Sequence, residues 1–158
     1  MVSVLFVCLG NICRSPTAHG VFQTLVTRDG LDNVIVVDSA GTGDWHLDEE
    51  PDKRSQVVAT TRGYDLSQLR SRLVTTQDFF EFDYVLAMDN KNITDLQLIC
   101  PASSKSVLGL FLKLGDVKDM EGVPDPYYGE MVDFEKVLDL IELAAAGLLQ
   151  RIKKKYKL

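Results

Sequence analysis

The chain has 158 residues, a natural length for one domain and enough to bury a hydrophobic core. Its formal net charge of -6 argues against a general nucleic-acid-binding protein, because such proteins need a basic face to neutralise phosphates. Three cysteines, an odd number, are not typical of a secreted disulfide framework. No secretory signal and no apolar run of membrane-spanning length occurs, so we expect a cytoplasmic protein that does not bind membranes.

The first half of the chain alternates between apolar runs and amphipathic segments. Val2–Val7 is short, apolar and rich in β-branched residues, which is typical of a buried strand. Ser15 followed by proline predicts a helix start, with Ser15 as the N-cap. A second apolar run at 34–37 predicts another strand, and the polar and glycine-rich residues at 38–43 predict a flexible connection after it.

The second half continues this alternation. Further strands are predicted at 84–88 and 106–112, and helices at 52–62, 75–81, 92–99 and 133–155. We therefore expect an α/β fold: a single three-layer domain over residues 1–158, with a mostly parallel, roughly four-stranded sheet and helices on both faces. Ligands in such folds bind beyond the carboxyl ends of the strands.

The segment between the first strand and the first helix carries the chemistry. Its residues are Cys8, Leu9, Gly10, Asn11, Ile12, Cys13, Arg14 and Ser15. The backbone N–H groups of such a loop, together with the helix N-terminus, can surround an anion. Gly10 and Asn11 suit the left-handed backbone that this arrangement needs. Arg14 is close enough in sequence to fold back and bind the same anion in a bidentate manner.

Cys8 at the base of this loop is expected to be an activated nucleophile. A helix N-terminus and a nearby arginine favour the thiolate form, to which the Ser15 hydroxyl can donate a hydrogen bond. A thiolate beneath a bound phosphoryl group is arranged for in-line attack. Alone, a cysteine followed by an arginine six positions later is a weak signal. The strand before it and the Ser-Pro pair after it make the signal strong.

The sequence resembles the low-molecular-weight protein tyrosine phosphatase family. The matching segments lie at 4–16, 38–42, Trp45, 82–85, 88–89 and 125–129, and so span almost the whole chain. The resemblance implies that Cys8 forms a phosphocysteine, that Arg14 binds the phosphate, and that Asp125 is the general acid and then the general base. Prolines on both sides of Asp125 make its loop rigid, which fits this role.

The resemblance also implies supporting roles for other residues. Asn11, Ser15 and Ser39 hold the phosphate-binding loop in shape, and Asp89 lies near the acid. The pocket walls and rim are formed by Leu9, Ile12, Trp45, His46, Tyr127 and Tyr128. Trp45 has the alternative of a loop anchor, the two tyrosines that of partial core packing, and His46 that of a solvated loop residue. The family makes phosphorylation of Tyr127 or Tyr128 plausible.

A tyrosine-phosphorylated protein is the implied substrate and inorganic phosphate the product and inhibitor, with a tyrosine kinase as a further candidate partner. No cofactor is implied. No metal site is expected either, since neither His19 nor His46 pairs with the cysteines at metal-ligand spacing.

Three features depart from the family or remain open. Family members often carry a histidine within the region equivalent to 65–72 that supports the loop asparagine; none occurs here, and Gln68 is the candidate replacement. His19 stands where a glutamate is common, although a surface position on the helix would explain it equally. Cys13 is a candidate partner of Cys8 in a protective disulfide. Its alternative is a small buried thiol that packs behind the loop.

Two rival functions stay open. A thiol-dependent arsenate reductase has a similar loop, but it needs further thiols in reach, and only Cys100 remains. A non-catalytic phosphotyrosine-binding or redox module would bind without turnover. It would need neither the nucleophile Cys8 nor the acid Asp125.

Overall fold

The computed structural model describes residues 1–158 and contains one parallel sheet of four strands. The strands are β1 (Val2–Cys8), β2 (Ile35–Gly41), β3 (Tyr84–Ala87) and β4 (Val107–Leu110), arranged in the order β2-β1-β3-β4. β1 is central and pairs in parallel with both β2 and β3. The predicted α/β fold class is confirmed.

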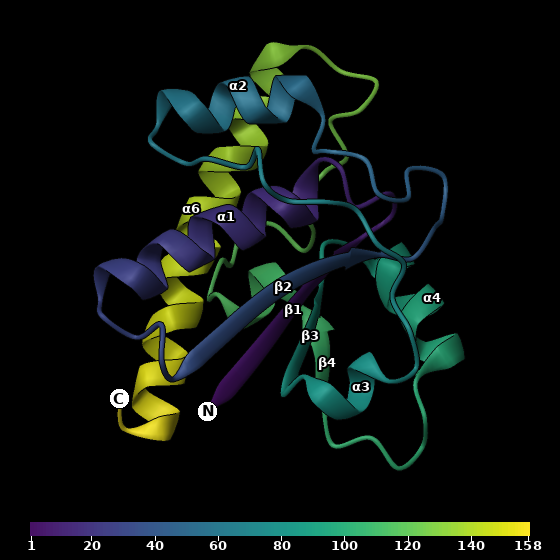
Figure 1. Ribbon diagram of the computed structural model, residues 1–158, viewed down its shortest axis with the longest axis vertical. Coiled ribbons are helices and arrows are strands. Elements are labelled where there is room, and N and C mark those ends of the chain that lie inside the picture. Colours follow the sequence, from purple (N-terminus) through teal and green to yellow (C-terminus); the bar gives the residue numbers. More distant parts are fainter.

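Helices cover both faces of this sheet (Figure 1). They are α1 (Arg14–Arg28), α2 (Lys53–Thr61), α3 (Asp78–Glu81), α4 (Asn90–Ile99), α5 (Phe111–Leu114) and the long α6 (Met131–Tyr156). α1, α5 and α6 contribute to the larger hydrophobic core on one face, and α3 and α4 to a smaller core on the other. The chain therefore forms three layers, as expected. No helix combines the length and the apolar character that crossing a membrane requires.

The alternation of side chains along β1 divides the two cores. Val4 and Phe6 point into the larger core, and Leu5 and Val7 into the smaller one, and all four are fully buried. Burial of both faces explains why β1 is an almost unbroken apolar run. The Phe6 ring packs edge-on against Phe22 of α1 and Phe111 of α5, with centroid separations of 5.6 and 4.9 Å.

Two boundary predictions near the loop are wrong. α1 begins at Arg14 with Cys13 as its N-cap, and no side chain caps it. Ser15 instead lies inside the helix, where its hydroxyl is bound to other groups. The segment 38–43 is also not a flexible connection, because β2 continues to Gly41 and pairs with β1 as far as Cys8. The backbone pairing extends the strand past its apolar residues.

The predicted strand at 106–112 is shorter in the structure. β4 ends at Leu110, and the chain turns at once into α5, which the sequence did not predict. Short apolar runs are ambiguous between strand and helix when only their periodicity is known. The remaining helices and strands lie within a few residues of their predicted positions, and Asp52 caps α2 by accepting a hydrogen bond from the Arg54 N–H at 2.8 Å.

Candidate active site

The loop after β1 turns its carbonyl groups away from the cavity. The carbonyls of Cys8 and Leu9 accept hydrogen bonds from the N–H groups of residues 42 and 43, each at 2.9 Å. The Ile12 carbonyl accepts from the N–H of Asp52 at 2.7 Å. The backbone N–H groups of residues 9–13, in contrast, form no hydrogen bond within the protein. The loop therefore has a set of free donors for an anion next to the N-terminus of α1.

Asn11 fixes the shape of this loop. It has a left-handed backbone with φ of 54° and is only 2% exposed. Its amide Nδ2 donates to Ser15 Oγ at 2.7 Å, and its Oδ1 accepts from the backbone N–H of Arg72 at 3.0 Å. Gly10 does not share the left-handed conformation that we expected. Its missing side chain matters for another reason, because a Cβ would lie 3.1 Å from His46 Cδ2.

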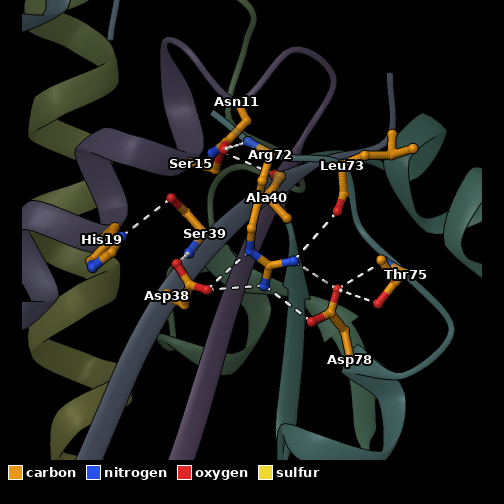
Figure 2. A network of polar contacts seen from close by, with 10 residues as sticks. All are labelled: Asn11, Ser15, His19, Asp38, Ser39, Ala40, Arg72, Leu73, Thr75 and Asp78. Atoms are coloured by element: carbon orange, nitrogen blue, oxygen red, sulfur yellow. Dashed lines mark hydrogen bonds and ion pairs between the residues drawn. The ribbon is translucent and has the colours of Figure 1, made fainter. Parts of the chain in front are cut away.

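Ser15 connects Asn11 to Cys8, the predicted nucleophile. Its Oγ lies 3.0 Å from Cys8 Sγ and 3.3 Å from the Ala40 carbonyl oxygen. Since Ser15 Oγ already accepts a hydrogen bond from Asn11, its own proton is available to a Cys8 thiolate. Figure 2 shows Asn11, Ser15 and Ala40 close together at the end of β2.

Arg14 is held at the base of the cavity by groups behind it. Its side chain is 3% exposed, and one terminal nitrogen donates to Asp89 Oδ2 at 2.6 Å and to the Val123 carbonyl at 3.0 Å. The other terminal nitrogen lies 3.6 Å from Asp125 Oδ2. Burial lowers the pKa of Arg14, but the negative charges of Cys8, Asp89 and Asp125 outweigh burial, and the pKa is raised. The guanidinium is therefore a permanent, oriented cation.

Asp125 lies on a loop that is attached to the end of β3. The Val123 N–H donates to the Met88 carbonyl at 2.7 Å, which fixes the start of the loop. Asp125 Oδ1 accepts a hydrogen bond from the Tyr127 N–H at 3.1 Å. The Asp125 side chain remains 44% exposed. Its carboxyl group can therefore reach both a bound leaving group and water.

The loop, Arg14 and Asp125 line one cavity of about 440 Å³. Its lining residues are Cys8, Leu9, Gly10, Ile12, Cys13, Arg14, Trp45, His46, Asp125, Tyr127 and Tyr128. The Tyr127 and Tyr128 rings pack edge-on with centroids 4.9 Å apart. His46 Nδ1 lies 2.8 Å from Glu49 Oε2, which orients the imidazole. The cavity thus has a polar base and an aromatic mouth.

The predicted supporting residues lie behind the cavity instead of lining it. Asn11, Ser15 and Asp89 contact the loop or Arg14 directly. Ser39 differs, because its Oγ contacts His19 Nδ1 at 3.2 Å and no group of the loop. His19 is half-buried and is therefore not a surface residue of the helix. Burial and the positive charge of Arg72 lower its pKa, against the opposing charge of Asp38.

Gln68 does not replace the missing histidine. Its side chain is exposed and contacts only Ser67, with Nε2 3.4 Å from Ser67 Oγ. The support for Asn11 comes instead from the backbone of Arg72, whose side chain pairs with Asp38 and Asp78. Sequence reasoning missed Arg72, because Asp38, one of its two carboxylate partners, is distant from it and from Asp78 along the chain.

Arg54 is a second residue that the sequence did not reveal. Its guanidinium makes a double hydrogen bond with the Asp52 carboxylate at 3.0 and 2.8 Å. It lies 5.6 Å from the centroid of the Tyr127 ring and 4.5 Å from that of Phe134. Arg54 therefore links the start of α2 to the aromatic mouth through cation–π contacts.

The two other cysteines have different surroundings. Cys13 is buried within the loop, and its pKa is raised to about 12, first by burial and then by the negative charges of Asp52 and Cys8. It is therefore a neutral thiol at ordinary pH. Cys100 ends α4 and does not line the cavity.

Comparisons with known proteins agree with this geometry. The model of the family described as low molecular weight phosphotyrosine protein phosphatase matches residues 3–158. The low molecular weight protein-tyrosine-phosphatase YfkJ of Bacillus subtilis is 40% identical over 158 residues and covers the full length of both chains. The Gallus gallus low molecular weight phosphotyrosine protein phosphatase is 41% identical over 155 residues, 94% of each chain.

Solved structures give the same result. The protein tyrosine phosphatase of Entamoeba histolytica, crystallised with Hepes in its active site, superposes with a TM-score of 0.93 at 37% identity over all of both chains. A Drosophila arginine phosphatase superposes with a TM-score of 0.87 at 31% identity, covering 100% of this chain and 99% of that one. Together these matches show that the chain belongs to the low-molecular-weight protein tyrosine phosphatase family and is an enzyme of that kind.

Proposed function

We propose that this phosphatase hydrolyses phosphotyrosine and other aryl phosphates through a phosphocysteine intermediate. Cys8 is the nucleophile, Arg14 the phosphate clamp, and Asp125 the general acid and base. The observation that carries the proposal is that Cys8 and Arg14 of the phosphate-binding loop line the same cavity as Asp125, which lies on a distant segment of the chain. The free N–H groups of residues 9–13 supply the additional donors that the phosphoryl oxygens need.

In the first step the Cys8 thiolate attacks phosphorus on the side opposite the phenolic oxygen. The S–P bond forms as the P–O bond breaks, and charge on the equatorial oxygens is stabilised by Arg14 and the loop N–H groups. Asp125 gives its proton to the departing phenolate oxygen and becomes a carboxylate. The Ser15 hydroxyl, 3.0 Å from Cys8 Sγ, stabilises the thiolate before attack.

In the second step water replaces the phenol. The Asp125 carboxylate takes a proton from this water as its oxygen attacks phosphorus, and the S–P bond breaks to regenerate the thiolate. Inorganic phosphate leaves, and Asp125 is protonated again for the next cycle. Asp125 therefore requires access to solvent, which fits its 44% exposed side chain.

Phosphotyrosine suits this cavity because the reactive groups, Cys8 and Arg14, lie at its bottom, below an aromatic mouth. Trp45, Tyr127 and Tyr128 offer flat surfaces to a phenyl ring. A shorter phosphoserine would leave these surfaces uncovered. The fold alone does not select the amino acid, since the Drosophila arginine phosphatase shares it. The aromatic mouth is what favours tyrosine here.

The biological setting follows from this proposal. The substrate is a tyrosine-phosphorylated protein, with a tyrosine kinase as a further candidate partner, and inorganic phosphate is the product and a competing ligand. We propose that residues 1–158 act as one catalytic domain in the cytoplasm. An arsenate reductase is disfavoured because Cys100 lies outside the cavity. A binding module is disfavoured because binding requires neither Cys8 nor Asp125.

Hydrolysis of p-nitrophenyl phosphate in the presence of EDTA and a thiol reductant tests the proposal. We expect turnover by the wild type, a loss of about 10⁴-fold or more in Cys8→Ser, and a loss of about 10²-fold to 10⁴-fold in Asp125→Ala. Cys100→Ser is the matched cysteine control and keeps full activity. Turnover by Cys8→Ser at the wild-type rate contradicts the proposal. Faster hydrolysis of phosphoarginine than of phosphotyrosine peptides contradicts the substrate assignment.

We further propose that Cys13 protects Cys8 from irreversible oxidation. Hydrogen peroxide oxidises the Cys8 thiolate to a sulfenic acid and is itself reduced to water. The Cys13 thiol then condenses with the sulfenic acid, which forms a disulfide and releases water. A thiol reductant restores both cysteines. Recovery of Cys13→Ser as complete as that of the wild type after peroxide treatment overturns this role.

A further inference from the structure

Arg72 is the centre of an ion-pair network behind the phosphate-binding loop (Figure 2). Its terminal nitrogens donate to both oxygens of Asp78, each at 3.0 Å. Its Nε donates to Asp38 Oδ2 at 3.1 Å, and one terminal nitrogen lies 3.0 Å from the same oxygen. A further donor reaches the Leu73 carbonyl at 3.4 Å. The guanidinium is thus fully used by the protein and contacts no cavity residue.

The partners of Arg72 lie on separate elements. Asp38 is on β2, whereas Asp78 is the first residue of α3 (Figure 2). The Asp78 side chain is 5% exposed, and its remaining partners are the N–H and hydroxyl of Thr75. A buried carboxylate without its cation is strongly disfavoured. The position of Arg72 is therefore fixed by Asp78.

The backbone of Arg72 transmits this position to the loop. Its N–H donates to Asn11 Oδ1 at 3.0 Å, and its carbonyl accepts from the N–H of Gly41 at 2.8 Å. Gly41 packs closely against the loop. A Cβ at this position would lie only 2.7 Å from the Leu9 carbonyl oxygen. Arg72 thus connects the buried Asp78 to Asn11 within the loop and to Gly41, which packs against the loop.

Asn11 is the point at which this support reaches the nucleophile. It holds a left-handed backbone that non-glycine residues rarely adopt, so its conformation depends on its contacts. The amide has two partners in the protein: Ser15, which contacts Cys8, and the Arg72 N–H. Loss of the second partner leaves the amide free to rotate away from Ser15.

From these contacts we infer that Arg72 is a positioning residue of the phosphate-binding loop, with Asp78 and Asp38 as its anchors. The inference rests on the proposed function of the same site. The network acts on the loop through the Arg72 backbone and Asn11, not on the substrate. It supplies the support for Asn11 that Gln68 does not give.

Arg72→Met, Arg72→Lys and Asp78→Asn test the inference, with Arg62→Met as the matched control. Arg62 also pairs with two carboxylates, Asp139 and Glu142, but it joins α2 to α6 away from the cavity. Each variant is assayed well below its unfolding temperature. Two readouts are needed: kcat with p-nitrophenyl phosphate, and the concentration of inorganic phosphate that halves the rate of Cys8 alkylation by iodoacetamide, followed by peptide mass.

We expect Arg72→Met to lower kcat by about 10-fold to 100-fold and to raise the half-protecting phosphate concentration by about 10-fold, because a displaced loop orients both nucleophile and donors poorly. Arg72→Lys keeps the charge but not the planar fork and gives a smaller change in the same direction. Arg62→Met loses stability only.

Wild-type values of both readouts in folded Arg72→Lys and Asp78→Asn would overturn the inference, even if stability falls. An equal effect of Arg62→Met would overturn it too. The protection readout needs no turnover. A wild type that binds phosphate but does not hydrolyse the aryl phosphate therefore contradicts the proposed function while leaving this test intact.

Discussion

The two ends of the cavity are built on different principles. At the base, Asn11 and Arg14 are 2% and 3% exposed. The Asn11 side chain forms hydrogen bonds with Ser15 and the Arg72 N–H, and the Arg14 side chain forms one with Asp89. At the mouth, Trp45 is 68% and Tyr128 is 94% exposed. The residues at the base are therefore fixed by buried hydrogen bonds, whereas the aromatic side chains at the mouth are largely exposed to solvent.

This difference matches the chemistry proposed for each end. Charge develops on the phosphoryl oxygens in the transition state, and donors that are fixed in advance stabilise it without reorganising. The leaving phenol belongs to a protein substrate whose surroundings vary, so exposed aromatic surfaces that tolerate different approaches suffice. We therefore expect changes at the base to affect kcat and changes at the mouth to affect KM.

Among changes that keep the proposed nucleophile and general acid, the largest effect is expected at the base, for Arg14→Lys. Lysine keeps the charge but cannot donate to Asp89 and Val123 behind it while presenting a planar fork to phosphate. We expect kcat with p-nitrophenyl phosphate to fall by about 10²-fold to 10³-fold. Arg62→Lys is the control on a surface ion pair and leaves kcat unchanged. A loss of less than about threefold in Arg14→Lys would mean that bidentate binding does not matter.

A smaller effect is expected where β2 supports the base, for Gly41→Ala. The new Cβ would lie 2.7 Å from the Leu9 carbonyl oxygen and 3.2 Å from Asn11 Cβ, so the loop must shift. We expect kcat to fall by about 10-fold to 100-fold and stability by about 1–3 kcal/mol, measured by denaturant unfolding.

Gly30→Ala separates these two consequences. Gly30 has a φ of 70° and nothing lies near its added Cβ, so the variant loses stability through backbone strain alone. Its kcat should equal that of the wild type. If Gly41→Ala behaves in the same way, the loop is less rigid than its contacts indicate.

At the mouth, Trp45→Ala should act on binding. Removing one exposed aromatic surface should raise KM for a phosphotyrosine peptide by about 2-fold to 10-fold and leave kcat close to the wild-type value. Leu98→Ala, an exposed apolar change on α4 that is outside the cavity, is the control. A fall in kcat with no change in KM would show that Trp45 belongs functionally to the base.

The smallest effect concerns the pH dependence of stability behind the base. The pKa of His19 is lowered, mainly by burial and also by Arg72, whereas it is about 6.5 in an unfolded chain. Below about pH 6.5 the unfolded chain therefore binds a proton that the folded one does not, and stability is lost as pH falls toward the lowered value.

His19→Gln removes this dependence and keeps a polar group toward Ser39. We expect the free energy of unfolding in urea to drop less for His19→Gln than for the wild type between about pH 7.5 and about pH 5.5. Identical drops for wild type and His19→Gln would place the His19 pKa at its ordinary value.

What the sequence predicted well is local along the chain. The phosphate-binding loop is eight consecutive residues between a strand and a helix, so its residue types and spacing alone indicate its chemistry. The alternating pattern of apolar runs predicted the sheet and both helix layers. The general-acid role of Asp125 was predicted only through the resemblance, because a lone aspartate between prolines has no distinctive local pattern.

What the sequence did not predict depends on contacts between distant segments. Arg72 acquires its role from Asp38 and Asp78 and from the backbone register that places its N–H on Asn11. Ser15 looked like an N-cap because local rules consider only its own helix, whereas its hydroxyl is taken by Cys8 and Asn11. Local sequence rules therefore fail to predict the roles of residues whose side chains are engaged in tertiary contacts.

The most direct test of the central proposal is to trap the covalent intermediate. In Asp125→Ala, p-nitrophenolate can still leave without a proton, but the base for the second step is missing, so the intermediate should accumulate. Rapid acid quenching followed by peptide mass analysis measures it. We expect one phosphoryl group on the peptide that carries Cys8, and none in the double variant with Cys8→Ser. A phosphoryl group on another residue, or none while turnover continues, would contradict Cys8 as the nucleophile.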